Sequence, residues 1–206
     1  MPSTISIFAL ASLALSALAL SACSSNDPRL GSRDMRYLYS DRANSNASQR
    51  AAADAVSYWD GDNVSGSPSI EVHLSEQRAY FYKGDTLVGV SQVSTGREGY
   101  NTPPGNFKVI QKDKDHRSSL YGDYVDPATQ QVVVKDAEAG KTPQPPGTVF
   151  LGASMPYFLR VHGGVGMHAG YLPGVPASHG CIRMPEFMAE NFFNHASTGT
   201  PVSIVR

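Results

Sequence analysis

The sequence predicts a mostly-β fold, either a β-barrel or a β-sandwich, with one helix near its C-terminal end. Nineteen glycines and fourteen prolines in 206 residues indicate many turns. From residue 68 onward, short apolar runs are separated by polar breaks; Ile70, Val72 and Leu74 alternate with polar neighbours as in a half-buried strand. Only residues 185–196 have the spacing of an amphipathic helix in this part of the chain.

The strand candidates follow one another with short breaks between them. "RAYFYK" (78–83) is rich in aromatic residues, and the turn residues "KGD" separate it from "TLVGVSQVS" (86–94). Five more apolar-rich runs predict further strands: "GNFKVIQK" (105–112), "QQVVVKD" (130–136), "TVFLGAS" (148–154), "YFLRV" (157–161) and "PVSIVR" (201–206).

The helix prediction for "PEFMAENFFNHA" rests on its first turn and on its apolar spacing. Pro185 suits the first helical turn, and the carboxylate of Glu186 suits the positive end of the helix dipole. Met188 and Phe192 are four residues apart, as are Ala189 and Phe193, so these side chains lie on one face.

Composition bounds the class of protein. Hydrophobic residues make up 41% of the chain and charged residues 17%, enough for one domain with a packed core. The formal net charge is -1 and no basic stretch stands out, which argues against a nucleic-acid partner. We expect a monomer.

The N-terminus predicts export and lipid attachment. Residues 5–22 are apolar or small with no charged side chain, as in the apolar region of a signal peptide, although the preceding "MPST" has no Lys or Arg. The signal ends in "LSAC", which resembles the lipobox of bacterial lipoproteins. This predicts a signal peptide at 1–22, a lipidated Cys23, and a membrane-attached protein on the extracytoplasmic side of a bacterial cell envelope (the periplasmic face if the host has an outer membrane). The alternative is a chance cysteine in a Ser/Ala-rich signal that is cut elsewhere.

Residues 23–67 are expected to be the lipidated cysteine followed by a polar tether or docking segment, and residues 68–206 the folded domain. Within the tether, 45–59 has the composition of a single helix, and "DGDNVSGSP" then breaks regular structure. Tyr58 and Trp59 are expected to pack on the domain.

The thiol of Cys181, in "SHGCIRMP" (178–185), is the main candidate for chemistry. If Cys23 is acylated, Cys181 has no partner for an internal disulfide and is an odd, reactive cysteine. Gly180 permits a tight turn in which successive N–H groups converge on one point, and the following helix is expected to lower the thiol pKa. A nucleophilic Cys needs a base, for which His168 and His162 are the candidates.

Other interpretations of these residues exist. One alternative is that Cys181 is an inert buried thiol, but glycine, histidine and a turn surround it rather than an apolar run. Together with His162, His168 and His179 it has the residue types of a zinc site, but the spacing matches no common structural zinc pattern. His73, His116 and His195 are expected to be surface or satisfied histidines. Residues 116–126 are either a substrate-facing loop or a plain surface hairpin.

Two blocks of sequence carry a family resemblance. "GVGMHAGYLPGVPASHGCIRMP" (164–185) resembles the motif of the L,D-transpeptidase catalytic domain, the YkuD-like fold, and "STG" (94–96) followed by "TPPGNF" (102–107) agrees with it. The resemblance covers roughly residues 68–206. It implies action on peptidoglycan stem peptides through an acyl-enzyme, without a metal or organic cofactor. An amine acceptor would give a 3–3 cross-link or attach a partner to the wall, and water would give L,D-carboxypeptidase action.

Carried over residue by residue, the resemblance implies a role for each part of the motif. Cys181 is the nucleophile, His168 the base, and the Ala169 carbonyl orients the imidazole. The N–H groups of His179, Gly180 and Cys181 form the oxyanion hole, and Ser178 and Arg183 support the site or contact substrate. Nine residues separate His168 from Ser178, and fifteen separate His162 from it.

Members of the resembled family often have the longer of these two spacings, and the count of intervening residues therefore favours His162 as the base. The local context "GVGMHAG" matches the residues around the family's base and favours His168. A non-catalytic, peptidoglycan-binding lipoprotein that retains the fold is the alternative function.

Overall fold

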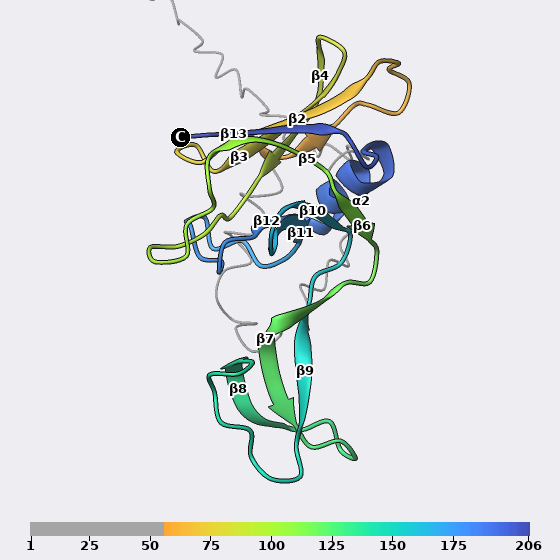
Figure 1. Cartoon of the computed structure of the whole chain (residues 1–206). Coiled ribbons are helices and arrows are strands. Elements are labelled where there is room, and N and C mark those ends of the chain that lie inside the picture. Colours follow the sequence, from red (N-terminus) through yellow and green to blue (C-terminus); the bar gives the residue numbers. More distant parts are fainter. Residues whose placement is uncertain (1–55) are drawn as a thin grey trace, which may run out of the picture.

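The computed structural model describes residues 56–206, which form three β-sheets and one helix (Figure 1). The predicted signal peptide, Cys23 and the greater part of the predicted tether lie outside the described residues. No helix among residues 56–206 has the length and apolarity required to cross a membrane.

The largest sheet has six strands in the spatial order β1-β4-β3-β2-β13-β5. The neighbours β2 and β13 are parallel, and all other neighbours in this sheet are antiparallel. In this order the strands are β1 (Tyr58–Trp59), β4 (Thr86–Gln92), β3 (Arg78–Lys83), β2 (Pro68–His73), β13 (Pro201–Val205) and β5 (Gly105–Lys108). The alternation at Ile70 and Val72 is confirmed, because both side chains are buried on the core face of β2.

A four-stranded sheet carries the sequence around the thiol, in the order β12-β11-β10-β6. Its strands are β12 (Ile182–Met184), β11 (Val165–Ala169), β10 (Phe158–His162) and β6 (Gln111–Asp113). Because β11 and β12 run parallel, His168 lies opposite Arg183, two residues after Cys181. This pairing brings the two halves of the histidine–cysteine motif to one end of the sheet.

Helix α2 (Glu186–His195) is the only helix among residues 57–206, and it covers the core as predicted. Met188, Ala189 and Phe192 are buried. The Phe192 ring lies 5.0 Å from Phe81 of β3, between centroids, and 6.2 Å from Trp59 of β1.

The predicted helix over 45–59 does not extend to its last residues, because Tyr58 and Trp59 form strand β1. Tyr58 pairs with Val90 and Trp59 with Gly89, so β1 completes the edge of the six-stranded sheet. A Cβ at Gly89 would lie 2.6 Å from the Trp59 ring, so the absence of a side chain there admits the indole. Trp59 is buried, and the prediction that it packs on the domain is confirmed.

The third sheet forms a separate arm with the order β8-β7-β9. It consists of β8 (Val132–Glu138), β7 (Arg117–Val125) and β9 (Val149–Ser154). The arm projects from the other two sheets through a narrow neck (Figure 1), and the main hydrophobic cluster contains no buried residue between Val109 and Leu159. The fold is therefore mostly β as predicted, with open sheets in the described chain rather than a closed barrel.

Candidate active site

One cavity is lined by the predicted catalytic residues and by most of the other predicted site residues. The cysteine loop contributes Ser178, His179 and Cys181, and β11 contributes His168 and Ala169. The opposite wall comes from the arm, through residues 118–122, 135–137 and 153–154. Residues 116–126 therefore include part of one wall of this cavity.

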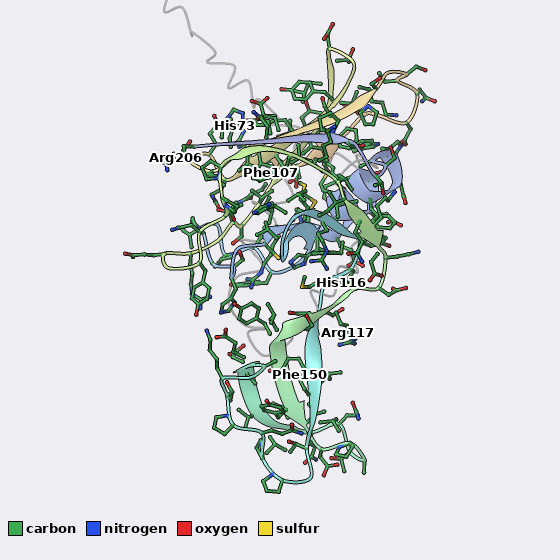
Figure 2. The ribbon with its side chains drawn as sticks, viewed as in Figure 1. His73, Phe107, His116, Arg117, Phe150 and Arg206 are labelled. Atoms are coloured by element: carbon green, nitrogen blue, oxygen red, sulfur yellow. The ribbon has the colours of Figure 1, made fainter. Side chains whose placement is uncertain are left out.

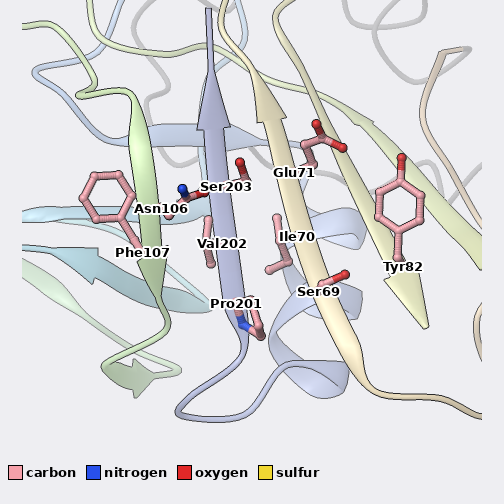
Figure 3. Close-up of a pocket in the computed structure, with 9 residues that line it drawn as sticks. All are labelled: Ser69, Ile70, Glu71, Tyr82, Asn106, Phe107, Pro201, Val202 and Ser203. Atoms are coloured by element: carbon pink, nitrogen blue, oxygen red, sulfur yellow. The ribbon is translucent and has the colours of Figure 1, made fainter. Parts of the chain in front are cut away.

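A second hollow lies on the outer face of the six-stranded sheet and has no such chemistry. Its lining residues come from β2, β3, β5 and β13, as Figure 3 shows: Ser69, Ile70, Glu71, Tyr82, Asn106, Phe107, Pro201, Val202 and Ser203. None of these side chains is a cysteine or a histidine, so the cavity at Cys181 is the candidate active site.

The Cys181 loop is fixed by a serine hydroxyl. Ser178 Oγ donates to the Cys181 carbonyl at 2.5 Å and accepts from the Gly180 N–H at 3.0 Å. Gly180 has φ of +112°, a backbone conformation that strains any residue with a Cβ. The Gly180 N–H is engaged inside the loop, and the N–H groups of His179 and Cys181 remain as the oxyanion-hole candidates.

The second sequence block braces this loop from behind. The buried Thr102 hydroxyl donates to the Gly180 carbonyl at 2.8 Å and accepts from the Gly96 N–H at 2.9 Å. Thr95 O accepts the Ser178 N–H at 3.0 Å. The "STG" and "TPPGNF" motifs therefore hold the cysteine loop in place, a role that the sequence resemblance did not specify.

His168 is held in one tautomer and in an uncharged form. Its side chain is buried, and Nδ1 donates to the Ala169 carbonyl at 2.8 Å, which leaves the lone pair on Nε2. Burial lowers the pKa of His168 to about 4; the Ala169 carbonyl opposes this shift, and the nearby side chains of Arg183 and His116 add to it. His168 is neutral at pH 7 and able to accept a proton.

The thiol of Cys181 is also uncharged at rest, contrary to the expectation that the following helix lowers its pKa. Burial raises the pKa of Cys181, and the Gly166 N–H, Arg183 and Arg160 only partly offset this effect. The helix cannot do more because strand β12 separates Cys181 from the first helical residue. Sγ donates to the Gly164 carbonyl at 3.6 Å.

His179 forms part of the wall and ties the loop to the arm. Its ring stacks on Tyr121 of β7 at 4.3 Å and meets the edge of Tyr100 at 4.7 Å. Its Nε2 lies 2.7 Å from Arg97 Nη2, so the imidazole accepts from the guanidinium. Burial, followed by the charges of Arg97 and Arg183, lowers the pKa of His179 and keeps it neutral.

Sequence reasoning missed Arg97, Tyr100 and Tyr121. Arg97 and Tyr100 lie within four residues after the "STG" motif, in "STGREGY". Their closeness to this motif was the sequence signal that could have placed them near the site. Tyr121 lies in the segment whose orientation the sequence left open.

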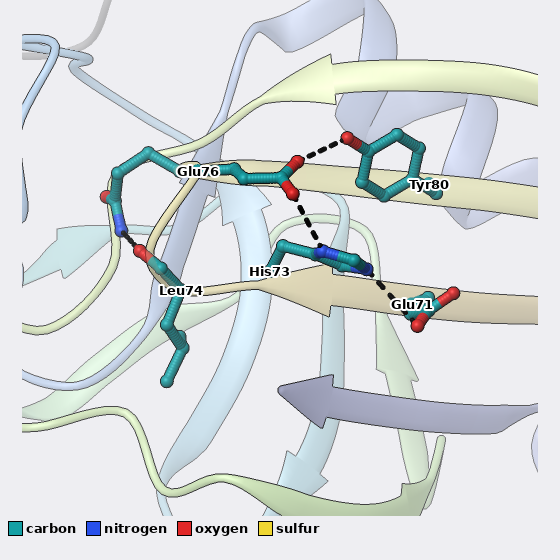
Figure 4. Close-up of polar contacts among 6 residues, drawn as sticks. Glu71, His73, Leu74, Glu76 and Tyr80 are labelled. Carbon is teal, nitrogen blue, oxygen red and sulfur yellow. Dashed lines mark hydrogen bonds and ion pairs between the residues drawn. The ribbon is translucent and has the colours of Figure 1, made fainter. Parts of the chain in front are cut away.

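The remaining histidines do not join the pair. His162, the alternative base, is exposed at the end of β10, its ring 5.1 Å from Phe107, and does not line the cavity. His195 contacts the Asn191 carbonyl at 2.9 Å. His73 contacts Glu71 and Glu76 (Figure 4), so it is a satisfied surface histidine as expected.

His116 lines the cavity at the neck of the arm, where Figure 2 labels it. It is satisfied by Asp113 at 2.9 Å, and its ring stacks on Phe158 at 4.2 Å.

The zinc interpretation finds no support in this arrangement. His162 faces Phe107, and His179 is bonded to Arg97, so the four candidate ligands do not converge. Within residues 56–206, no three side chains of His, Cys, Asp or Glu gather as a metal ion would require.

The fold and the motif agree with one protein family. The family model of the L,D-transpeptidase catalytic domain (YkuD) matches residues 67–204, more than half of the chain. The chain therefore belongs to the L,D-transpeptidase catalytic-domain family.

Several known proteins are similar to the chain. The probable L,D-transpeptidase ErfK/SrfK of Salmonella typhimurium is 29% identical over 143 residues, which cover 66% of this chain and 43% of that protein. The chain thus spans less than half the length of this relative.

Solved structures show the same fold at low sequence identity. An L,D-transpeptidase from Stackebrandtia nassauensis is 19% identical with a TM-score of 0.50, covering 69% of this chain and 57% of that one. An L,D-transpeptidase from Mycobacterium smegmatis is 18% identical with a TM-score of 0.50, covering 68% and 59%. LdtMt1, solved in complex with imipenem, is 19% identical with a TM-score of 0.50, covering 68% and 59%.

Proposed function

We propose that the chain is a cysteine-dependent L,D-transpeptidase that acts on peptidoglycan stem peptides through an acyl-enzyme. The observation that carries this proposal is one cavity that holds a thiol and an uncharged imidazole whose tautomer is fixed by a carbonyl. That combination is what nucleophilic catalysis by cysteine requires. Family membership supports the same reaction class.

The first half of the reaction transfers the peptide to the enzyme. The Cys181 thiol turns from the Gly164 carbonyl toward His168 Nε2 and loses its proton as Sγ attacks the carbonyl between the L-centre and the terminal D-residue. The N–H groups of His179 and Cys181 stabilise the oxyanion. Because the pKa of His168 is about 4, its protonated imidazole gives up a proton more readily than an ordinary imidazolium, and it passes this proton to the departing amine.

The second half depends on the acceptor. An amine of another stem peptide attacks the thioester and gives a 3–3 cross-link, or attaches a partner to the wall. Water gives L,D-carboxypeptidase action instead. In each case His168 Nε2 takes the proton of the attacking group and returns it to Sγ, so one base serves both halves.

Purified stem tetrapeptides test this function. Incubation with the protein should release the terminal D-alanine and yield dimers or tripeptides, read by mass. Cys181→Ala should abolish both products while leaving thermal unfolding near that of the wild type, because one small side chain is lost. Full activity in Cys181→Ala would place the nucleophile elsewhere, and an inactive wild type would favour the peptidoglycan-binding alternative.

We further propose that Cys23 carries a lipid and attaches the protein to the outer side of a bacterial membrane. The support is the uncharged apolar stretch that ends in "LSAC", since cleavage before a lipidated cysteine uses such a sequence. Several acyl chains bind a bilayer firmly, where a single chain is marginal. The mature protein should begin at an acylated Cys23, and Cys23→Ser should remain an unlipidated precursor. A soluble wild-type protein with another N-terminus would refute the anchor.

A further inference from the structure

Arg160, on the middle of β10, presents a guanidinium to the active-site cavity in a fixed orientation. Its Nε donates to Gln111 Oε1 at 2.7 Å, and its Nη1 donates to the Gly163 carbonyl at 2.8 Å. Gln111 is its cross-strand partner on β6, and the guanidinium carbon lies 5.1 Å from the centre of the Phe158 ring. Arg160 is therefore held by three contacts, from Gln111 on β6, from Gly163 in the turn after β10 and from Phe158 on its own strand.

Among residues 56–206, no carboxylate compensates the charge of this side chain. Within the described part of the chain, the partners of the guanidinium are an amide oxygen, a main-chain carbonyl and an aromatic ring, all of them neutral. The two hydrogen bonds use two of the five N–H donors of arginine. Three donors remain for a ligand in the cavity that Arg160 lines. A guanidinium with such a free fork matches the geometry of a carboxylate.

Two contacts place this guanidinium next to the reacting thiol. Gly163 O accepts from Arg160, and the carbonyl of the next residue, Gly164, accepts from Cys181 Sγ. In addition, Arg160 pairs across the strands with Gly166, whose N–H interacts with the same sulfur. The guanidinium and the thiol therefore flank one short hairpin, on neighbouring backbone positions.

We propose that Arg160 is the binding site for the terminal carboxylate of the D-residue that leaves during acylation; this inference rests on the function proposed above. In a stem tetrapeptide that carboxylate lies one residue beyond the attacked carbonyl, a step of about 3.8 Å along the chain. A carboxylate this near to the attacked carbonyl lies within the cavity that Cys181 and Arg160 both line. The amine-bearing side chain of the preceding residue carries its own carboxylate several bonds further from the attacked carbonyl.

Recognition of this carboxylate makes the cavity selective for chain ends. A peptide bond inside a longer stem has no charge at that position and leaves the guanidinium without its partner. A terminal D-residue supplies the carboxylate and sets the scissile bond against the thiol. Arg160 would thereby select tetrapeptide donors over longer stems, and it acts on the substrate rather than on the proton transfer.

The test compares two donors that differ in one group: the stem tetrapeptide ending in D-alanine and the same peptide ending in D-alaninamide. Wild type should prefer the carboxylate in kcat/KM by about 10- to 100-fold, the range expected for hydrogen bonds to a charged group. Arg160→Gln should lose this preference by slowing only the carboxylate donor. Arg160→Lys should keep part of it, because the charge remains while the fork is lost.

Arg78→Gln, the same chemical change on β3 of the large sheet, is the matched control and should keep the full preference. Equal rates of the two donors with wild type would overturn the inference while the proposed function stands. An Arg160→Gln variant that slows both donors alike would also overturn the inference. The same holds if the preference for the carboxylate donor is lost on replacement of Lys135, another cationic residue that lines the cavity, and not on replacement of Arg160.

Equilibrium binding separates the inference from the reaction. With Cys181→Ala, which cannot turn over, the carboxylate donor should bind about 10- to 100-fold more tightly than the amide, and the added Arg160→Gln change should remove the difference. Binding selectivity in a protein that never releases D-alanine would refute the proposed function and retain the carboxylate site. Selectivity that follows amidation of the side-chain carboxylate of the third residue, rather than of the terminal one, would overturn the assignment.

Discussion

At the scale of single residues, the site depends on the tautomer of one buried imidazole. A carbonyl cannot donate, so its contact with His168 Nδ1 requires the proton on that nitrogen and frees Nε2 to act as base. Ala169 supplies this carbonyl through its backbone, so its side chain carries no chemical requirement. A backbone acceptor has no charge, and the resting histidine stays neutral in its buried position.

The two candidate bases should respond very differently to removal. The family resemblance implies that a carbapenem acylates Cys181. This step requires a base within reach of the thiol, so His168→Ala should slow it by orders of magnitude. His162→Ala should change the rate by only a few-fold, because that ring faces Phe107 at 5.1 Å and lies outside the cavity lining. Intact-protein mass, followed over time at neutral pH, measures both variants. If His162→Ala were inactive and His168→Ala active, His162 would be the base, and the residue spacing would have been the better guide than the local context.

Residue identity was easier to predict than residue environment. The "SHGC" motif indicates Cys181 as the candidate thiol, and the histidines upstream of it leave His168 and His162 as candidate bases. The raised thiol pKa was not predictable, because it comes from burial by segments far away in sequence. The engagement of the Gly180 N–H by Ser178 likewise depends on how the loop closes, which no pattern of residue types specifies.

At the scale of elements, the cysteine loop is held by a segment about eighty residues earlier in the chain. Ser94 and Arg183 exchange two backbone hydrogen bonds, of 2.9 and 3.0 Å, and Gly96 bridges to Ser178. Thr102 adds the side-chain link between the two segments. These contacts explain why two distant motifs accompany each other: one carries the thiol and the other fixes its position.

Thr102→Val tests this bracing, since it keeps the shape and removes the hydroxyl. The change leaves the buried Gly180 carbonyl and Gly96 N–H without their partner, which should cost about 1–3 kcal/mol in the free energy of unfolding. Carbapenem acylation should also slow, because the loop loses one fixed point. Urea unfolding and the acylation time course measure the two effects. Thr86→Val, at the start of β4, is the control; an unaltered Thr102→Val would show that the loop holds its shape without this hydroxyl.

Local patterns predicted single strands well and their grouping poorly. The alternation at 70–74 and the apolar runs at 78–83 and 86–94 correspond to β2, β3 and β4, which pair with their sequence neighbours. The run at 105–112 instead divides into β5 and β6, which belong to different sheets. The break lies at Val109, which is buried and bonds to Thr200, and at Ile110, which bonds to Arg160. Such partners are long-range and leave no periodic trace in the sequence.

At the scale of the whole molecule, the cavity lies where the arm meets the body. The body supplies the Cys181 thiol and the His168 imidazole, and the arm supplies the facing wall. The stacking of Tyr121 on His179 joins the two directly. The sequence could not predict this arrangement, because the arm is an excursion between β6 and β10 whose strands look like any others. Only the pairing of its strands with each other, and not with the body, makes it separate.

The buried histidine also links the stability of the whole fold to pH. The pKa of His168 is about 4 in the folded state and 6.5 without the fold, so between these values the unfolded chain binds a proton that the folded chain does not. Protons therefore favour unfolding in this window, and the free energy of unfolding falls as pH decreases from 6.5 toward 4. A difference of 2.5 pH units corresponds to about 3 kcal/mol.

His168→Gln should remove this dependence, because glutamine does not titrate. Urea unfolding between pH 7.5 and about 4 measures the free energy of unfolding of both proteins. Over this window the wild type should lose about 3 kcal/mol more than His168→Gln. Carboxylates that titrate in the same range contribute equally to both proteins and cancel in the difference. His162→Gln, which replaces an exposed imidazole, should follow the wild type. Parallel curves for wild type and His168→Gln would mean that the pKa of His168 is the same in the folded and unfolded chain, so that burial does not shift it.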